Sequence, residues 1–356
     1  MTLQELGWND FFASHFAAHA AEGRVPARVT LQLKGHFEVT GDFGAKLGEC
    51  TGHFLHHATR QPALPAIGDW AAVTPRDEHR ADIHALLPRR TTFSRQAAGE
   101  DLQQVVAANV DTVFLVSALD ADYSLHRIER YIAAAWASGA QPVVLLNKVD
   151  LCDDPAVKLH EVQSVACGVP VLTLSARTRR GLKELAPWLQ PGQTIALLGS
   201  SGVGKSTLIN RLVGEKLQDT QEVREYDGKG RHTTTQRELI VTPDGYIVID
   251  TPGMRELQPW DAAAGVTAAF ADVADIAARC KFRDCSHTVE PGCAVAAALA
   301  DGTLELARWQ SFGRLQRATA HEIRQVDQRA ALQTKSKFKK LTKALRQRVK
   351  EKHGDE

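Results

Sequence analysis

The spacing of apolar residues changes along the chain and divides it into regions of different predicted structure. Residues 1 to about 25 are rich in alanine and have a helical pattern. From about residue 28 to residue 90, short runs of alternating apolar and polar residues are interrupted by glycines, which is typical of strands joined by tight turns. About 60 residues of this kind suit an OB-type barrel, and the pattern alone leaves an SH3-like barrel open. The clearest runs are Val29–Leu33, His36–Val39 and Trp70–Val73.

Beyond Asp111 the apolar runs become continuous, which indicates strands that are buried on both faces. Helical stretches such as Leu125–Ser138 and Lys183–Leu189 separate several of these runs, and an alanine-rich helical region follows Pro259. The alternation predicts a doubly wound α/β sheet with ligand-binding loops at the carboxyl ends of its strands. The predicted strands are Thr112–Ala118, Pro142–Leu146, Pro170–Leu174, Thr194–Leu198, Leu239–Val241 and Tyr246–Ile249.

The charges are balanced in number but unevenly placed. The 356 residues include 43 lysines and arginines against 42 acidic residues, and the chain is long enough for two or three domains with separate cores. Eight basic residues lie between Lys335 and Lys350, where no acidic residue occurs. This basic arm fits either a solvated tail or a segment that contacts nucleic acid.

Two classes of protein are disfavoured by what the sequence lacks. No apolar run approaches the ~20 residues of a membrane span, and the first residues lack the basic and apolar regions of a signal peptide. Cys50, Cys152 and Cys167 are scattered, so they read as small apolar residues and not as a disulfide framework. We therefore expect a cytoplasmic monomer with no membrane partner.

A phosphate-binding loop follows the predicted strand Thr194–Leu198 and precedes a helical stretch at Ser206–Leu212. Its glycines allow backbone N–H groups to surround phosphates at a helix N-terminus, which favours negative charge. Lys205 is expected to reach the β- and γ-phosphates, and the Ser206 hydroxyl to ligate Mg²⁺. The predicted nucleotide contacts are Gly199, Ser200, Ser201, Gly202, Val203, Gly204, Lys205, Ser206 and Thr207.

A second motif, Asn147-Lys148-Val149-Asp150, selects the base. The Asp150 carboxylate can accept from N1–H and the 2-amino group of guanine, whereas adenine would leave it unpaired. Asn147 would hold the loop, and the stem of Lys148 would cover the base. Ser175-Ala176, after the next strand, matches a backbone contact to the guanine carbonyl. The predicted ligand is therefore GTP or GDP.

The third motif, Asp250-Thr251-Pro252-Gly253, is expected to hold Mg²⁺ through water at Asp250 and to contact the γ-phosphate at Gly253. The preceding loop, Gly228–Thr235, resembles a switch that closes on Mg²⁺ through Thr234 or Thr235. Met254 occupies the place where a GTPase commonly has a water-orienting glutamine. We therefore expect slow intrinsic hydrolysis, and either His232 or a partner must supply the group that orients the water.

The order of the motifs is rotated. A GTPase ordinarily runs from the phosphate loop through Asp-x-x-Gly to Asn-Lys-x-Asp, but here the Asn147 motif comes first and the Asp250 motif last. This order predicts a circularly permuted GTPase. Downstream, three cysteines and one histidine within fourteen residues predict a closed tetrahedral zinc site that is structural. These ligands are Cys280, Cys285, His287 and Cys293.

Together these motifs resemble the ribosome small-subunit-dependent GTPase A family, also called YjeQ, over roughly residues 28 to 330. The resemblance implies GTP hydrolysis stimulated by the small (30S) ribosomal subunit, a role in its late maturation and contact with 16S rRNA. It also implies an OB-fold domain and one zinc ion per chain. We expect an extension at 1–27, the barrel at 28–92, the permuted GTPase domain at 93–258, a helical zinc domain at 259–330 and the basic arm at 331–356.

A rival interpretation remains open. The chain could be a GTPase switch for a protein partner, with the barrel and the zinc domain as protein-binding modules. The two interpretations differ in the expected salt dependence of binding, because contacts with RNA phosphates release counterions.

Overall fold

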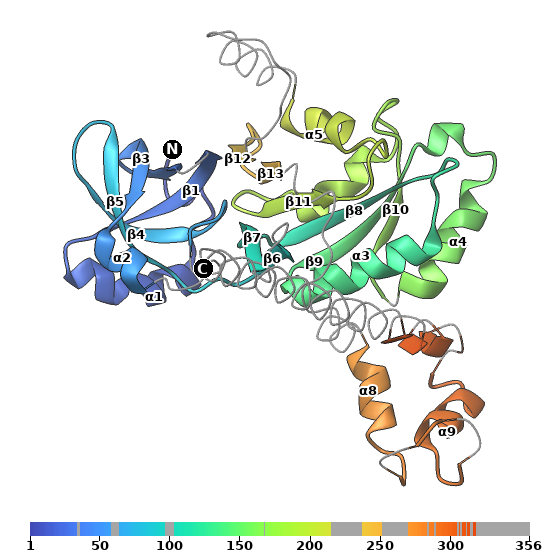
Figure 1. The fold of residues 1–356 in the computed structure, drawn as a ribbon. Helices are drawn as coiled ribbons and strands as arrows, with labels where there is room; N and C mark the ends of the chain where they lie inside the picture. The colour runs from blue at the N-terminus through green and yellow to red at the C-terminus, as the bar shows by residue number, and fades with distance from the viewer. Residues whose placement is uncertain are drawn as a thin grey trace, which may run out of the picture.

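The computed structural model describes residues 1–33, 36–57, 64–96, 103–166, 168–214, 237–250, 270–282, 285–287 and 290–304, with 306, 308–310, 312–313 and 316–317 (Figure 1). The strands are β1 (Val25–Leu33), β2 (His36–Gly41), β3 (Gly44–Cys50), β4 (Trp70–Pro75), β5 (Arg80–Leu86), β6 (Thr92–Gln96), β7 (Gln103–Ala108), β8 (Thr112–Ala118), β9 (Gln141–Asn147), β10 (Val171–Thr173), β11 (Thr194–Leu198), β12 (Arg237–Val241) and β13 (Ile247–Asp250). The helices are α1 (Asp10–Ala21), α2 (Gly52–His57), α3 (Leu125–Ser138), α4 (Pro155–Ala166), α5 (Lys205–Val213), α8 (Ala271–Ala277) and α9 (Ala294–Ala300), with 3₁₀ helices η2 (Val149–Leu151) and η3 (Leu182–Trp188).

The N-terminal strands form a closed barrel. The strand order β1-β2-β3-β5-β4 returns to β1, and all of these pairings are antiparallel except that of β3 with β5. Side chains that alternate along the strands fill the interior, as a closed sheet requires. This five-stranded order is that of an OB-type barrel and decides against the SH3-like alternative. The interior residues are Ala27, Val29, Val39, Ala71, Val73, Ala81 and Ile83.

The helix α1 packs against the outside of the barrel at β4, in a cluster separate from the barrel interior. Asn9 caps this helix by accepting from the Phe11 and Phe12 amides. The rings of Trp8 and Phe12 lie 4.7 Å and 5.7 Å from the ring of the fully buried Trp70. These aromatic contacts explain why the alanine-rich N-terminal helix is held against the barrel.

The second unit is the predicted doubly wound sheet. β10, β9, β8, β11 and β13 are parallel neighbours in that order. Alternate residues of β8 enter different cores: Val113 and Leu115 pack with α3, whereas Phe114 and Val116 pack with α5. Because both faces are covered by helices, every residue of β8 is buried. Burial on both faces therefore explains the continuous apolar runs of the sequence.

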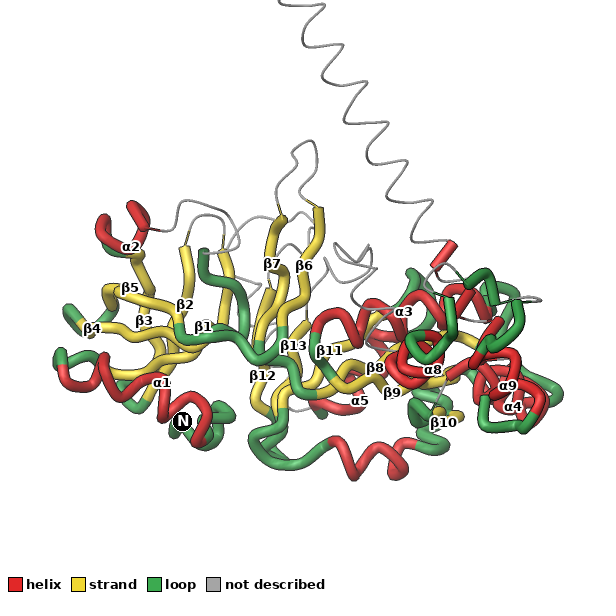
Figure 2. The backbone as a smooth tube through the Cα atoms, turned by 90° about the horizontal axis from the view of Figure 1, so that it is seen from below, coloured by secondary structure: helices red, strands yellow, loops and turns green. Residues whose placement is uncertain are grey.

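The barrel and the α/β sheet share one strand, which the sequence patterns did not predict. β12 pairs antiparallel with β13 on one side and with β1 on the other, where Leu31 faces Glu238. The result is a continuous sheet of eleven strands. Figure 2 shows the barrel strands and the α/β strands on either side of β12.

One predicted helix has a different geometry. The sequence pattern predicts a helix at Lys183–Leu189, and the structure has the 3₁₀ helix η3 there. It begins after Gly181, whose φ is 77°, and contains Pro187. Pro187 lacks an N–H donor, and the segment is only seven residues long, so the tighter 3₁₀ turns suffice.

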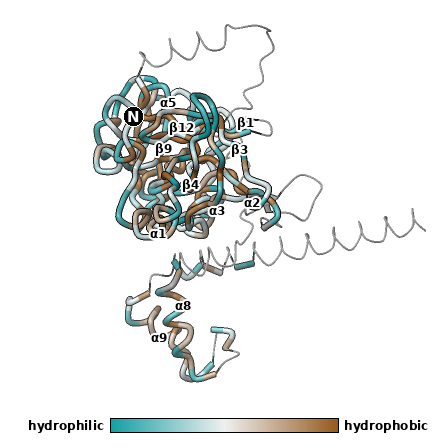
Figure 3. The backbone as a smooth tube through the Cα atoms, turned by 90° about the vertical axis from the view of Figure 1, so that its left-hand side faces the viewer, coloured by the Kyte–Doolittle hydropathy of each residue, from teal (hydrophilic) through white to brown (hydrophobic). Residues whose placement is uncertain are grey.

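A small helical unit follows the α/β sheet in the chain. α8 and α9 pack together around Val273 and Val295, and Ala133 of α3 belongs to the same apolar cluster. In Figures 1 and 3 this unit projects from the main body on the side of α3. Among the described residues, no helix has both the length and the apolarity needed to cross a bilayer.

Candidate functional site

The phosphate loop joins β11 to α5 and depends on glycine at two crowded positions. A Cβ on Gly199 would lie 2.3 Å from the Val116 carbonyl oxygen, and one on Gly204 would lie 2.3 Å from the Asn147 Nδ2. Both distances are too short for any side chain. Gly202 and Gly204 also have positive φ values of 80° and 96°. The loop can therefore lie against β8 and β9 only as this glycine-rich sequence.

Asn147, at the end of β9, connects the phosphate loop to a second loop. Its side-chain Nδ2 donates to the Val203 carbonyl at 2.8 Å, and its Oδ1 accepts from the Ala176 amide at 3.0 Å. The residue is 2 % exposed. A buried amide with both of its ends bonded is a rigid brace, so three segments that are distant in sequence are held together.

The residues predicted to select the base lie beside this Asn147 side chain. Lys148 has a φ of 64° and donates from Nζ to Asp120 Oδ2 at 2.7 Å. Val149 is buried, and Asp150 follows it in η2. A hydrogen bond from the buried Ser175 hydroxyl lowers the pKa of the Asp150 carboxyl. Asp150 is therefore ionised at neutral pH and can act as an acceptor only.

Lys205 and its neighbours begin α5. The Lys205 ammonium donates to the Gly199 carbonyl at 2.6 Å and to the Ser200 carbonyl. Its charge is thus held at the phosphate loop. Ser201, Ser206 and Thr207 have exposed side chains at the loop and the first turn of the helix.

A cluster of charged and polar side chains connects α3 to the phosphate loop. The sequence patterns did not identify this cluster. Arg127 Nη1 donates to Asp122 Oδ2 at 2.5 Å and to Ser200 Oγ at 2.9 Å, while Ser200 Oγ donates to the same carboxylate at 2.7 Å. The bonds from Arg127 and then Ser200 lower the pKa of Asp122. The position of the two aspartates in the sequence could have indicated this cluster. Asp120 and Asp122 follow β8, which is a neighbour of β11 in the sheet.

Asp250 lies at the same edge of the sheet as the phosphate loop. β13 runs parallel to β11 with Ile249 opposite Ala196, so Asp250 is level with the end of β11, where the loop begins. Its side chain is exposed. Several predicted residues lie outside the described part of the chain, namely His232, Thr234, Thr235, Gly253, Met254 and the basic arm.

The four predicted metal ligands come together in the unit of α8 and α9. Their ligand atoms all lie within 4.8 Å of one another. The Sγ atoms of Cys280 and Cys293 are 4.0 Å apart, and the His287 Nδ1 is 3.5 Å from the first and 3.7 Å from the second. Tetrahedral ligands at ~2.3 Å for sulfur and ~2.0 Å for nitrogen would be separated by about 3.5–3.8 Å. The set, completed by Cys285, has the donors and the spacing to hold a metal ion.

Comparison with protein-family models assigns residues 86–260 to a model described as RsgA GTPase. This range contains all three guanine-nucleotide motifs. A second model, described as ABC transporter, matches residues 182–350. That stretch contains the phosphate loop, a motif shared by many nucleotide-binding proteins.

Individual relatives match most or nearly all of the chain. A small ribosomal subunit biogenesis GTPase RsgA of Opitutus terrae is 52% identical over 98% of this chain and 98% of its own. The crystal structure of YjeQ from Thermotoga maritima is 26% identical, covers 83% of this chain and 99% of its own, and has a TM-score of 0.64. The structure of YloQ, described as a circularly permuted GTPase, has the same fold at 23% identity with a TM-score of 0.61. It covers 84% of this chain and 96% of its own.

Proposed function

Because this chain belongs to the RsgA family of GTPases, we propose that it hydrolyses GTP during late maturation of the small (30S) ribosomal subunit. In this proposal the protein contacts the subunit and its 16S rRNA in a nucleotide-dependent way. The relatives are named for small-subunit biogenesis. The buried Asn147 brace is the observation that best supports nucleotide binding here, because it aligns the phosphate loop with the loop that would meet the base.

The nucleotide contacts follow from this arrangement. We assign guanine recognition to Asp150, with Lys148 over the base and the Ala176 amide facing the guanine carbonyl. Asn147, Val149 and Ser175 hold these loops in place. The phosphates would lie in the loop Gly199–Thr207, where Lys205 supplies the charge.

Hydrolysis needs a bound magnesium ion, an in-line water and compensation for the developing charge. We assign magnesium contacts to Ser206, Thr234 and, through water, Asp250, and a γ-phosphate contact to the Gly253 amide. Met254 has no polar atom suited to orienting water, so His232 is our candidate for that role.

The test is steady-state GTP turnover with and without purified small ribosomal subunits. We expect slow turnover alone and strong stimulation by subunits. The His232→Ala variant should bind GTP almost normally but lose most of the stimulated rate, because the group acts mainly in the transition state. Absence of stimulation in the wild type would contradict the proposed function, and full stimulation of the variant would assign the water-positioning group to the subunit.

The strand β12, which the barrel and the α/β sheet share, supports a link between the bound nucleotide and binding of the ribosomal subunit. β12 is bonded to β13, which ends at Asp250, and also to β1 of the barrel. We propose that changes at the nucleotide site shift the barrel through this strand. The domain division proposed is 1–27, 28–92, 93–258, 259–330 and 331–356. The protein acts in this proposal as a cytoplasmic monomer.

A GTPase switch for a protein partner is the second candidate function. It is favoured only by the unit of α8 and α9, which projects from the main body beside α3 and would suit a protein-binding module. Steep salt dependence of binding to subunits would support RNA contact, and a flat dependence would support a protein partner.

We also propose that the metal held by the Cys/His set is zinc and that its role is structural. Three thiolates with one imidazole are characteristic of closed zinc sites, and four protein ligands leave no open position for a substrate. A metal that binds only the folded unit contributes directly to its stability.

The Cys285→Ser variant is expected to lose the zinc and to destabilise the unit of α8 and α9. Metal analysis should give about one zinc per chain in the wild type and much less in the variant, and thermal unfolding should begin earlier. Cys152→Ser, a half-buried cysteine outside the cluster, is the matched control and should retain the metal. Equal zinc content in Cys285→Ser and the wild type would refute this site.

A further inference from the structure

An open cavity lies at the far end of α5 from the phosphate loop. It has a volume of about 470 Å³. Asn210 and Gly214 are five and nine residues beyond Lys205, so a helical rise of ~1.5 Å per residue places the cavity about 8–14 Å from the phosphate end. It is therefore separate from the phosphate loop. We call it the basic pocket; it is lined by Arg179, Leu182, Lys183, Asn210, Arg211 and Gly214.

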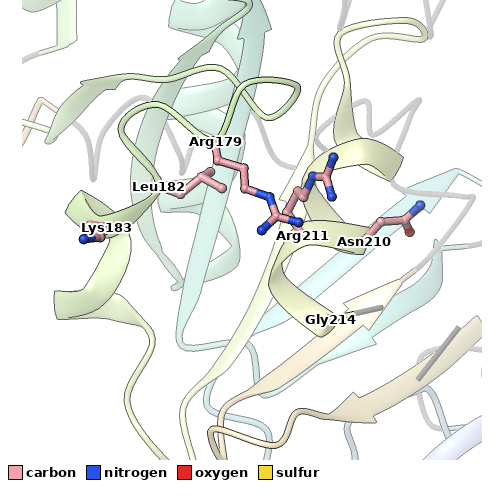
Figure 4. A pocket seen from close by; sticks show the side chains of 6 residues that line it. All are labelled: Arg179, Leu182, Lys183, Asn210, Arg211 and Gly214. Carbon is pink, nitrogen blue, oxygen red and sulfur yellow. The ribbon is translucent and has the colours of Figure 1, made fainter. Parts of the chain in front are cut away.

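Positive charge dominates the lining of the basic pocket. The side chains of Arg179 and Arg211 come from different segments and extend into the same space, with Lys183 to one side of them (Figure 4). Among the six described residues that line it, none has a carboxylate. Guanidinium groups have a planar set of N–H donors that matches the geometry of phosphate oxygens.

The loop that supplies Arg179 is built rigidly. Ser175 N donates to the Arg180 carbonyl at 3.0 Å, and Thr178 N donates to Ser175 Oγ at 3.1 Å. A Cβ on Gly181 would lie 2.5 Å from the Thr173 carbonyl oxygen, so this turn depends on glycine. Arg179 itself has a φ of 65°, which few non-glycine residues adopt. A closed turn with an uncommon backbone conformation fixes the backbone position from which the Arg179 side chain extends.

The basic pocket continues into a strip of exposed cations. Residues 177–183 include Arg177, Arg179, Arg180 and Lys183, all exposed, and no acidic residue. A single phosphate ion would need only two of these cationic side chains. Phosphates that recur along a strand match a series of cations, and arginine is well suited to phosphate oxygens.

We propose that the basic pocket and its strip bind the phosphodiester backbone of an RNA strand. This inference rests on the proposed function and gives the G domain an RNA contact of its own. Such contacts position a protein on RNA without reading its sequence. The binding energy would come mainly from counterion release.

The test is a charge series at Arg179 and Lys183, two residues of the basic pocket to which no nucleotide contact is assigned. Arg211 is left unchanged because its Nε donates to the Ala176 carbonyl at 3.4 Å. The three double variants are Arg179→Lys with Lys183→Arg, Arg179→Gln with Lys183→Gln, and Arg179→Glu with Lys183→Glu. None of these replacements is β-branched, so the left-handed backbone of Arg179 is no more strained than in the wild type. Binding to intact small subunits and to rRNA extracted from them is measured against salt, with GTP affinity of the free protein as the folding control.

The charge-retaining variant should bind like the wild type. The neutral variant should lose about fivefold to tenfold in affinity per contact near 0.1 M salt, and its salt slope should fall by about one per contact. The reversed variant should bind weaker still, while GTP affinity stays constant in all three. Equal affinity and slope across the series would overturn the proposal. Loss of binding to subunits but not to rRNA would overturn it in favour of a ribosomal protein.

The proposed function and the RNA contact of the basic pocket can be contradicted separately. A wild type whose turnover is not stimulated by subunits would contradict the role in subunit maturation. If the charge series still lowered rRNA binding in that case, the basic pocket would stand as an RNA site of a GTPase with another role.

Discussion

Replacing Asp150 with asparagine is expected to lower GTP affinity by well over tenfold. The carboxylate would accept from two guanine donors, and an amide presents one N–H group where an acceptor is needed. The structure prepares Asp150 for this role, because the bond from the Ser175 hydroxyl lowers its pKa and keeps it ionised. The loss is measured by calorimetric titration of the folded variant with GTP.

Asp153→Asn is the matched control, since this exposed carboxylate lies three residues away in the same loop region. It should bind GTP like the wild type. Xanthosine triphosphate offers a second check, because xanthine has a carbonyl where guanine has its 2-amino group. The amide introduced by D150N can donate to that carbonyl, so the variant should prefer this nucleotide. Unchanged GTP affinity in D150N would refute the assignment of the base site.

The Arg28→Met variant is expected to lose about 3–5 kcal/mol of stability. Arg28 is 1 % exposed, and its guanidinium donates to the carbonyls of Leu6, Gly68 and Asn109 at 2.5, 3.3 and 3.1 Å. It also lies 5.6 Å from the Trp70 ring centroid. These acceptors belong to the N-terminal segment, the barrel and the connection to the α/β sheet. Methionine fills part of the volume but leaves three buried carbonyls without this donor.

Burial lowers the pKa of Arg28 to about 10, although the charges of Asp111 and Asp69 oppose the shift. The side chain therefore remains charged at neutral pH, and its carbonyl partners hold that charge. Arg28→Lys should recover little stability, because an ammonium cannot reach three acceptors spread around a planar fork. Arg24→Met is the control. Arg24 forms a partly exposed ion pair with Glu22, so this variant should lose at most about 1 kcal/mol of stability. Denaturant unfolding followed by tryptophan fluorescence measures both, and an unchanged midpoint for Arg28→Met would contradict this role.

The strands and helices of the α/β unit were predictable because their pattern is local. Thr112–Ala118, Thr194–Leu198 and Leu125–Ser138 were predicted with the bounds that the structure has. Burial on both faces requires an unbroken apolar run, so the sequence itself reports it. The 3₁₀ geometry of η3 was missed, because apolar spacing over seven residues does not distinguish it from an α-helix.

The sequence by itself determined the predicted chemistry of this protein: a phosphate loop, a motif predicted to select the base, a permuted order and four residues that could hold a metal ion. Each is a short motif whose residue types are dictated by the ligand, so it can be read without the fold. Only the tertiary structure decided how distant segments meet. The Asn147 brace, the Arg127–Asp122–Ser200 cluster, the buried Arg28 and the sharing of β12 between sheet and barrel all join residues far apart in the chain. Such contacts depend on strand order and register, which leave no local pattern, because a one-residue shift in pairing changes every neighbour while the sequence stays the same.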